Sequence, residues 1–587
     1  MTAIAKWSAW RRISQTVEWR LTTHFFGAMF DFGILTPAGA DSLTHFLMGG
    51  IGCLLALGLG ATRVYAAKYA ALSGAHSPEP YRLAVLGDDL FLIGLPMLIL
   101  ALLTVLVSHS VFPDERDFRI LSPLPVRRIV IVRAKLAALG LYTGMFIAVI
   151  HLALAPLMLL TCIGRYREHA IVWRFAASLI SSVTASLFSV LAITALSGAL
   201  MLVLSRTRFH SLSALAKSGM LTALVLCIPF VFHLPGLGRA MSARADWLML
   251  LPPSWFVGLE HVLLGSFDSW FLRLAMIAAT ALLLASSVVA GVYIVLFRHF
   301  EALLLRPPSV SSGWLRRLAD SQTVQAFART RWTGAAAPAF RAVRRFTAAT
   351  FARSQLHQGV IIGLSACGLS LALRRLVGSD LMSHIGSSNP PSLSFMGSIA
   401  WAPFALMFVC GIGIRAAIAL PMAHHANWIF RMTESEEGRR EEMRAVNHVA
   451  IAYVVGPPVA LAVVVMWLLI GSAAAIIAAF IVSAVGVVFV HLVLLDWRRI
   501  PFTCSYLPGK RLVAHTLVFG FAAFALFTSA GSVLLGISAI RPSIPVAIAS
   551  ALFALGWFLQ QRRFAMWLET PLIFDDDLPD QPLQLGL

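Results

Sequence analysis

Two charged segments carry the residues whose types and spacing fit a chemical role, and that role is docking onto another protein. Each segment holds a Phe-Arg pair followed by an Arg-Arg pair, and the pattern recurs 312 residues later with the same internal spacing. Each stands just before a long apolar run, which begins near Leu136 or His448. Apolar side chains supply contact area and charges fix the register, so this mixture suits a protein contact. The shared residues are Phe118, Arg119, Arg127 and Arg128, and then Phe430, Arg431, Arg439 and Arg440.

The first of these segments, residues 112–135, has a composition that a simple connecting loop does not need. It mixes both signs of charge around an apolar centre that contains Pro123, Leu124 and Pro125. The prolines limit the conformations around a short exposed helix or turn. Lys135 then opens the next apolar run. The segment is predicted to dock onto a soluble partner, and a solvated loop that only sets membrane topology is the alternative.

The composition places the chain among membrane proteins. Hydrophobic residues make up 59% of the 587 and charged residues 12%, whereas soluble domains carry about 25% charged residues. The net charge of +19 could indicate nucleic-acid binding, but no nucleic-acid motif is visible. Basic loops on the cytoplasmic side explain the charge more simply. We therefore expect membrane lipids, and not nucleic acid, around this chain.

Long apolar helices must position the two charged segments. A helix of about 20 apolar residues crosses a bilayer core, and the chain contains twelve such stretches. The predicted fold is an all-α integral membrane protein with twelve transmembrane helices arranged as two six-helix repeats. The predicted spans are 43–61, 89–111, 136–161, 175–204, 218–235 and 268–297, and then 359–373, 396–420, 447–470, 473–496, 512–535 and 543–561.

The distribution of basic residues predicts the orientation. With the N-terminus inside, Lys and Arg are about three times as frequent in the inside segments as in the outside ones, as the positive-inside rule requires. Both termini are therefore predicted to be cytoplasmic, in a multi-pass protein of the inner membrane. The predicted parts are a first six-span half at 1–297, a basic cytoplasmic linker at 298–358 and a second six-span half at 359–587.

Each half is predicted to begin with an amphipathic helix on the inner membrane surface. In both places an arginine pair is followed eight residues later by another arginine. Such helices place arginines near lipid phosphates, although ordinary juxtamembrane anchors are the equal alternative. The arginines are Arg11, Arg12 and Arg20 in the first helix, and Arg344, Arg345 and Arg353 in the second.

The sequence offers little for catalysis. The glycine-lysine pair at Gly509-Lys510 lacks the upstream glycine and the hydroxyl residue of a phosphate-binding loop. His424-His425 is predicted to be interfacial, and Asp575–Asp577 a solvated tail. Arg415 lies within a predicted span and is expected to reach toward the inner surface. We expect no enzyme, no metal site and no cofactor in this chain.

Residues 117–135 resemble a known family. Asp117-Phe-Arg-Ile-Leu-Ser-Pro-Leu-Pro-Val-Arg-Arg-Ile-Val-Ile-Val-Arg-Ala-Lys135 looks like the stretch between the second and third spans of ABC-2 type transporter permeases. The segment 251–265 is similar to the family's partly re-entrant outer segment. The resemblance implies a six-span unit that starts with an amphipathic cytoplasmic helix. It also implies that the stretch between spans two and three holds a coupling helix, seated in a groove of a separate ATPase subunit.

Two such units make one transporter in that family, so this chain resembles two units fused. The resemblance implies two ABC ATPase subunits as partners, with ATP bound on them, and an exporter whose substrate is not given. The second half departs from the pattern. Glu434, Glu436 and Glu437 replace the proline-containing centre, and Asn447 stands where Lys135 stood. The second half also lacks a long outer segment before its last span, and its docking is expected to be weaker or to use a different ATPase surface.

An ion-coupled secondary transporter of the major facilitator kind is the main alternative. It also has six plus six spans, with both termini inside. Its loop between spans two and three is short and contains glycine, whereas the loop here is long and proline-centred. A proton-coupled carrier also usually needs a carboxylate within a span. Asp88 and Asp89 are expected at a span edge, so the ABC-2 permease is preferred.

Overall fold

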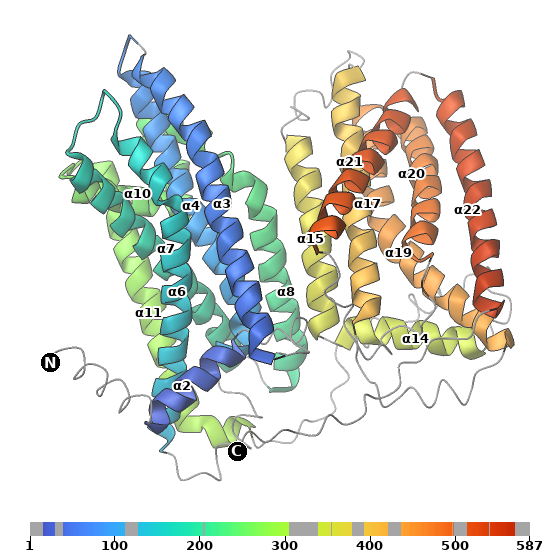
Figure 1. Cartoon of the computed structure of the whole chain (residues 1–587), viewed down its shortest axis with the longest axis horizontal. Helices are drawn as coiled ribbons and strands as arrows, with labels where there is room; N and C mark the ends of the chain where they lie inside the picture. The colour runs from blue at the N-terminus through green and yellow to red at the C-terminus, as the bar shows by residue number, and fades with distance from the viewer. Residues whose placement is uncertain are drawn as a thin grey trace. The chain divides into compact units, whose positions relative to one another are not determined.

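The computed structural model shows helices and short turns throughout the part of the chain that it describes (Figure 1). The chain divides into two compact units, Met1–Ser311 and Ser312–Leu587, and the boundary lies within the predicted linker. The described residues are 16–29, 39–74, 76–111, 127–203, 206–304, 338–353, 355–377, 393–420, 436–495, 497, 513–538 and 541–569.

The first unit has a helix at each of its six predicted apolar segments, together with a short preceding helix and a set of short helices before the last long one. Its elements are α2 (Val17–Ala28), α3 (Gly39–Ser73), α4 (Glu79–Val111), α6 (Arg128–Cys162), α7 (Ile171–Val203), α8 (Arg206–Val231), η1 (Leu234–Leu237), α9 (Gly238–Ser242), η2 (Asp246–Leu250), α10 (Pro252–Leu263) and α11 (Ser269–Leu304).

The second unit also consists of long helices, but it has no described helices between its last two. Its elements are α14 (Pro338–Arg353), α15 (Gln355–Val377), α17 (Leu393–Ala419), α19 (Glu436–Leu469), α20 (Ser472–Val493), α21 (Val513–Ser538) and α22 (Ser543–Glu569).

Ten of the described helices are long and apolar enough to cross a membrane. An eleventh candidate is a pair of helices, Gly219–Val231 and Leu234–Ser242, which meet at a bend of 63°. These helices fit a multi-pass membrane protein. The number twelve stays a prediction.

Several helices begin earlier than the hydropathy of the sequence predicts. α4 begins at Glu79, ten residues before the predicted span at 89, and α19 begins at Glu436, eleven before 447. Residues 436–446, predicted as part of a charged loop, are therefore helical, and that prediction is wrong. Glu and Arg are good helix formers, and acidic residues such as Glu436 and Glu437 are favourable at a helix N-terminus. Charge ends an apolar run without ending a helix.

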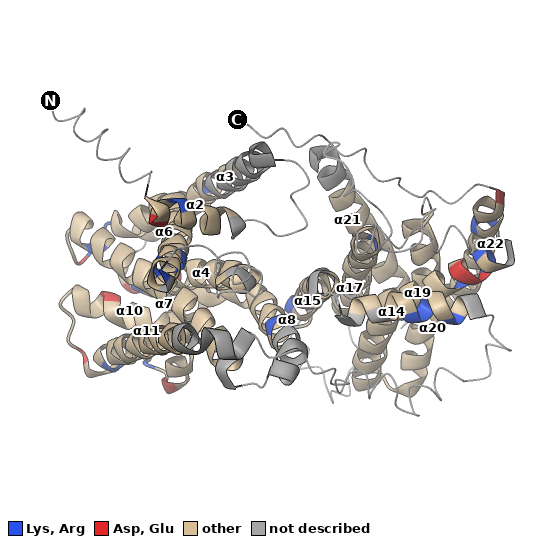
Figure 2. Cartoon of the chain, turned by 90° about the horizontal axis from the view of Figure 1, so that it is seen from below, with Lys and Arg blue, Asp and Glu red and all other residues tan. Residues whose placement is uncertain are grey.

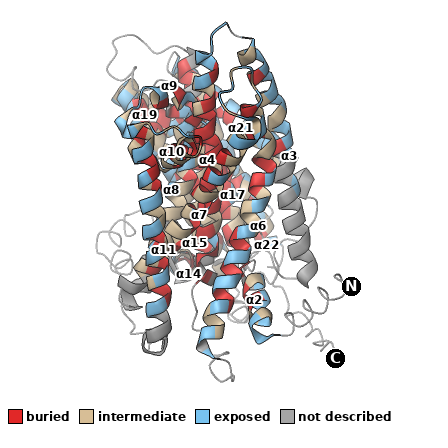
Figure 3. Ribbon diagram, turned by 90° about the vertical axis from the view of Figure 1, so that its left-hand side faces the viewer, coloured by how far each residue is buried: buried red, intermediate tan, exposed pale blue. Residues whose placement is uncertain are grey.

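Helix α4 is the central element of the first unit. Of the residues in its most apolar stretch, 72% are buried, and Figure 3 shows buried residues concentrated along it. At one end of the bundle, α2 packs against α6 and buries Phe25 and Met29 beside Val111 of α4 and Tyr293 of α11. The short helices η1, α9 and α10 pack against the opposite part of α4.

The second unit has a similar arrangement at its own end. Helix α14 runs across the ends of the long helices (Figure 1) and packs against α19. Phe340 and Val343 of α14 are buried in the main apolar cluster of this unit, while Arg341 and Arg345 are exposed. This separation is the amphipathic pattern expected of a helix at a membrane surface.

The contact between α4 and the short helices depends on glycine at position 87. A Cβ atom there would lie 2.1 Å from the backbone oxygen of Pro235. We predict that Gly87→Ala destabilises the protein by about 1–3 kcal/mol, because the backbones would have to separate. The measurement is the Tm of the full chain in detergent. Gly236→Ala is the control, since a Cβ there meets nothing within 4 Å; an equal Tm for both variants would contradict the close contact.

Candidate functional site

The structure places some of the predicted docking residues and leaves the others outside its described ranges. Those within the described ranges are Arg127, Arg128, Lys135, Arg439 and Arg440. Those outside are Phe118, Arg119, Pro123, Leu124, Pro125, Phe430 and Arg431. Of the predicted membrane-surface arginines, Arg20, Arg344, Arg345 and Arg353 lie on α2 or α14, and Arg11 and Arg12 lie outside the description.

Both ends of the first charged segment are fixed to packed helices. On one side, the Tyr293 hydroxyl of α11 donates to the carbonyl oxygen of Val111 at 2.8 Å, at the last residue of α4. On the other side, Arg127 is the N-cap of α6, and its carbonyl accepts from the Val130 N–H at 2.9 Å. Val111 and Tyr293 are both buried. The segment thus begins at a buried residue that α11 holds and ends at the exposed N-cap of α6.

Lys135 joins the start of α6 to α2. Its side chain is buried, and its Nζ lies 4.9 Å from the centre of the Phe25 ring. A cation over an aromatic face is attracted by the ring electrons, most strongly where water is excluded. Through this contact and the apolar packing of Phe25, α2 is packed firmly against the first turns of α6.

The second charged segment also ends on a fixed helix. Arg439, near the start of α19, donates from Nη1 to the carbonyl oxygen of Leu568 on α22 at 3.4 Å. Arg440 is exposed beside it. His448 of α19 packs edge-on against Phe340 of α14. In each unit, therefore, an amphipathic helix packs on the helix that follows the charged segment.

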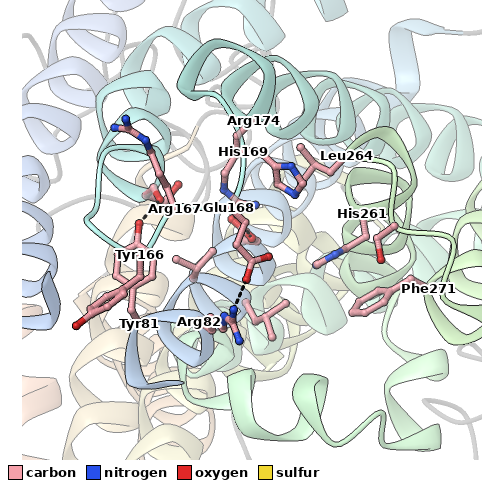
Figure 4. Close-up of a pocket in the computed structure, with 15 residues that line it drawn as sticks. Tyr81, Arg82, Tyr166, Arg167, Glu168, His169, Arg174, His261, Leu264 and Phe271 are labelled. Carbon is pink, nitrogen blue, oxygen red and sulfur yellow. Dashed lines mark hydrogen bonds and ion pairs between the residues drawn. The ribbon is translucent and has the colours of Figure 1, made fainter. Parts of the chain in front are cut away.

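A polar cavity of about 250 Å³ lies in the first unit, near the ends of helices away from α2 (Figure 4). Its walls come from the first turns of α4, the turn before α7, and the segment where α10 leads into α11. An ion pair between Arg82 Nη2 and Glu168 Oε1, 2.7 Å apart, crosses its mouth. The other lining residues labelled in the figure are Tyr81, Tyr166, Arg167, His169, Arg174, His261, Leu264 and Phe271.

Arg174 forms the floor of this cavity and connects two buried carboxylates. Its Nη2 lies 2.7 Å from Asp89 Oδ2 and 3.7 Å from Glu260 Oε1. The side chains of Asp89 and Glu260 are each 1% exposed. The three residues come from α4, α10 and α7, and these helices pack against one another. One guanidinium thus faces two carboxyl groups where water is nearly excluded.

Of the two carboxyl groups, Glu260 makes fewer hydrogen bonds. Neither of its oxygens has a hydrogen-bond partner, whereas Asp89 accepts from Arg174. Burial raises the pKa of Glu260 to about 8, the charge of Asp89 adds to the rise, and Arg174 opposes it. Glu260 lies on α10, outside the candidate spans. It is therefore mostly protonated at neutral pH, which leaves one anion, Asp89, paired with one cation, Arg174.

The neighbouring carboxylate has a separate partner set. Asp88 accepts from Lys68 Nζ with both oxygens at 2.7 Å, and from the Tyr69 hydroxyl at 2.7 Å. Asp88 and Asp89 are almost fully buried, and they follow nine or more residues of helix, about 14 Å at 1.5 Å per residue. These residues therefore lie well inside α4 and not at its start. Their place at a span edge stays a prediction.

Sequence reasoning missed Arg174 and Glu260. Arg174 stands three residues into a helix after a polar turn, and it looks like an ordinary charge at a span end. Glu260 is a single acid among apolar residues of a predicted outer segment. Its position as a lone acid in apolar surroundings could have indicated a buried ion pair, because a buried acid needs a partner. Its partner is 86 positions away in the chain, so spacing gave no indication.

Other polar residues of the spans have hydrogen-bond partners within the bundle. His151 Nε2 lies 3.0 Å from Ser182 Oγ, which donates to the carbonyl of Leu92 at 3.1 Å. Arg415 donates to the carbonyl of Val493 at 3.1 Å. Among the described residues, no group of three or more His, Cys, Asp and Glu could hold a metal ion. His424-His425, Gly509-Lys510 and Asp575–Asp577 lie outside them.

Comparisons with known proteins identify no relative of this chain, so its function is argued from the residues described above. No protein-family model, no curated protein and no solved structure matches the chain.

The protonation of Glu260 predicts a pH dependence of stability. The unfolded chain releases this proton near pH 4.5, and the folded chain holds it until about pH 8. This group's contribution to stability therefore falls as the pH rises between these values, by up to about 1.4 kcal/mol per pH unit, and is constant below and above them. Glu260→Gln is expected to flatten this part of the curve of Tm against pH.

Glu168→Gln is the matched control for this prediction. Glu168 lies at the mouth of the same cavity, with a side chain that is 56% exposed. Its removal should leave the slope between pH 5 and 8 as in the wild type. If Glu260→Gln kept the wild-type slope, Glu260 would not be the group that holds the proton.

Proposed function

We propose that this protein is the transmembrane permease subunit of an ATP-driven ABC-2 type exporter, with two fused six-span halves and a separate ATPase. On this proposal the chain crosses the inner membrane twelve times and keeps both termini in the cytoplasm. Two ATPase subunits contact the charged segments at 112–135 and 426–444. ATP is bound and hydrolysed on those subunits, and the chain itself holds no cofactor.

The observation that carries the proposal is the anchoring of the first charged segment. It joins Val111 to Arg127, two points held by α11 and by the N-terminus of α6. A push on this segment would reach α11 and α6 directly, because its two ends lie against or within those helices.

The same packing supplies a route for the push. Arg127 and Arg128 stand at the start of α6, which continues without interruption to Cys162. Lys135 couples α6 to α2 through Phe25, so a displacement at the segment would move both helices. On this proposal, closure of the ATPase pair tilts α6 and α2 together, and the path opens where the long helices separate.

The second unit supports a repeat with a modified docking element. Its α14 packs on α19 as α2 packs on α6, and α19 extends the charged residues into a rigid helix. α21 ends at Ser538 and α22 begins at Ser543, so the outer helices of the first unit have no counterpart there. The acidic residues at the start of α19 would face a different ATPase surface from the proline-centred loop.

One observation favours an ion-coupled carrier as the second candidate. Asp89 and Glu260 share Arg174 beneath a polar cavity, and buried carboxylates of this kind serve proton-coupled transport. The expectation that no carboxylate lies within a span counts against this class, but Asp89 is buried well inside α4. The anchored charged segment has no role in such a carrier, so the ABC-2 proposal is preferred.

The docking segment gives the first test. In Arg127→Glu with Arg128→Glu, like charges would face the acidic groups that a partner presents to these arginines, and a co-expressed candidate ATPase should co-purify several-fold less. The control is Arg165→Glu with Arg167→Glu, an exposed pair on the turn between α6 and α7, which should leave co-purification unchanged. Equal recovery with both variants would contradict docking at this segment.

A transport measurement separates the two candidates. In proteoliposomes with the partner ATPase, uptake into inside-out vesicles should require ATP and persist after a proton gradient is collapsed. Asp89→Asn, which removes the anion facing Arg174, should then change stability more than it changes the dependence on ATP. Transport driven by a pH gradient alone, and abolished by Asp89→Asn, would support the carrier instead.

A further inference from the structure

Arg563 of α22 is a buried arginine without a carboxylate. Its side chain is 2% exposed, and none of the ion pairs between described residues includes it. Its Nη1 donates to Asn447 Oδ1 of α19 at 2.9 Å and to His491 Nδ1 of α20 at 3.1 Å. Both partners are neutral groups, in contrast to the carboxylates around Arg174. The charge of Arg563 is hydrogen-bonded but not neutralised.

The direction of these hydrogen bonds fixes the chemistry of the remaining atoms. A guanidinium can only donate, so the Asn447 oxygen and the His491 Nδ1 must both accept. The Asn447 Nδ2 group is then left as a donor, and a neutral His491 carries its proton on Nε2. Neither of these two nitrogens has a hydrogen-bond partner. The three residues together present donors and no acceptor.

Two further donors lie in the same part of the unit. The Nε of Arg563 itself has no partner, and neither does the indole nitrogen of Trp567, one helical turn along α22. Asn447, His491 and Trp567 are 3%, 1% and 4% exposed, so water does not satisfy them from the surface. Buried polar groups in folded proteins are nearly always paired. Four buried donors on three packed helices therefore indicate a missing acceptor.

An anion supplies what these groups lack. It would neutralise Arg563, and its oxygens would accept from the nitrogens that have no partner. A phosphate-type group fits best, because it offers three acceptor oxygens and the planar guanidinium fork matches two of them. We propose that Arg563, Asn447 and His491 form a binding site for a phosphate-type oxyanion, supplied by a phospholipid headgroup or by soluble phosphate. This proposal does not depend on ATP-coupled transport.

The position of the site in the second unit suits this ligand. The carbonyl oxygen of Leu568, five residues after Arg563, accepts a hydrogen bond from Arg439 near the start of α19. Helix α14 packs against the same helix α19. Figure 2 shows Lys and Arg on α14 and on α22 in a view toward this end of the unit. Basic residues gather where lipid phosphates lie.

The light packing of helix α22 provides a route by which an anion could reach Arg563. Only 17% of the residues in its most apolar stretch are buried, the smallest share among the candidate spans. Trp557 and Phe558 of the same helix are exposed by 64% and 55%, as expected of a surface against lipid. A headgroup could reach Arg563 through a small displacement of this lightly packed helix.

The test is anion-dependent stabilisation of the full chain in detergent. We would measure Tm against inorganic phosphate, with chloride at the same ionic strength as the reference. A second series would use dioctanoyl phosphatidylglycerol, with dioctanoylglycerol, which lacks the phosphate, as its reference. A saturable rise in Tm is expected with at least one phosphate probe. Stabilisation by the lipid at much lower concentration than by phosphate would identify the headgroup as the source.

Three variants connect the effect to the site. Arg563→Met is expected to weaken the response by about tenfold or more, because charge-assisted hydrogen bonds are lost. Asn447→Asp is nearly isosteric and places a carboxylate beside Arg563, so it should raise Tm without phosphate and abolish the response. Arg562→Met removes the same charge from the adjacent exposed position and should respond as the wild type does.

Two results would overturn the proposal. One is a wild-type Tm that rises no more with either phosphate probe than with its reference. The other is an equal response in the wild type and in Asn447→Asp, which would place any bound anion elsewhere. Asn447→Asp keeps the test decisive even if Arg563→Met fails to fold.

Discussion

The apolar helices of this protein cannot solvate a charge, so every buried ionised group must meet an opposite charge or enough hydrogen bonds. The first unit satisfies this requirement internally. Lys68 neutralises Asp88, Arg174 neutralises Asp89, and a proton on Glu260 removes the remaining charge. These pairs connect α3, α4, α7 and α10. Asp89 and Arg174 also line the cavity, so one of the pairs stands at its wall.

The second unit meets the same requirement incompletely. Its buried cation, Arg563, has neutral partners, and the nitrogens around it have no acceptor. The two units therefore differ in chemistry although both place an amphipathic helix on the helix that follows a charged segment. In the first unit, the helix after the charged segment is α6, which carries Lys135. The residue 312 positions later is Asn447 of α19, which accepts a hydrogen bond from Arg563. On a two-repeat interpretation, the buried cation has moved from the third helix to the last.

Sequence alone predicted the helical membrane class and the approximate places of the long helices, because apolar runs of span length have few other uses. It placed the starts of α4 and α19 too late, since hydropathy detects the lipid-facing stretch and not the polar turns that continue the helix. It recognised Asp88 and Asp89 but not their burial, because Arg174 and Glu260 are distant in the chain. Arg127 and Arg128 were singled out by their spacing. The hydrogen bond from Tyr293 to Val111, which holds the other end of that segment, required coordinates.

The pairing of Asp88 and Asp89 with different helices has a consequence for how the chain enters the membrane. Lys68 and Asp88 belong to consecutive helices, so α3 and α4 can be released into lipid together as a hairpin in which that charge is already compensated. Asp89 has no such neighbour, and its arginine is 85 residues further on. During synthesis α4 must therefore remain within the insertion machinery, or carry a proton on Asp89, until α7 arrives. The two adjacent carboxylates thus require their partner helices at different stages of assembly, α3 for Asp88 and α7 for Asp89.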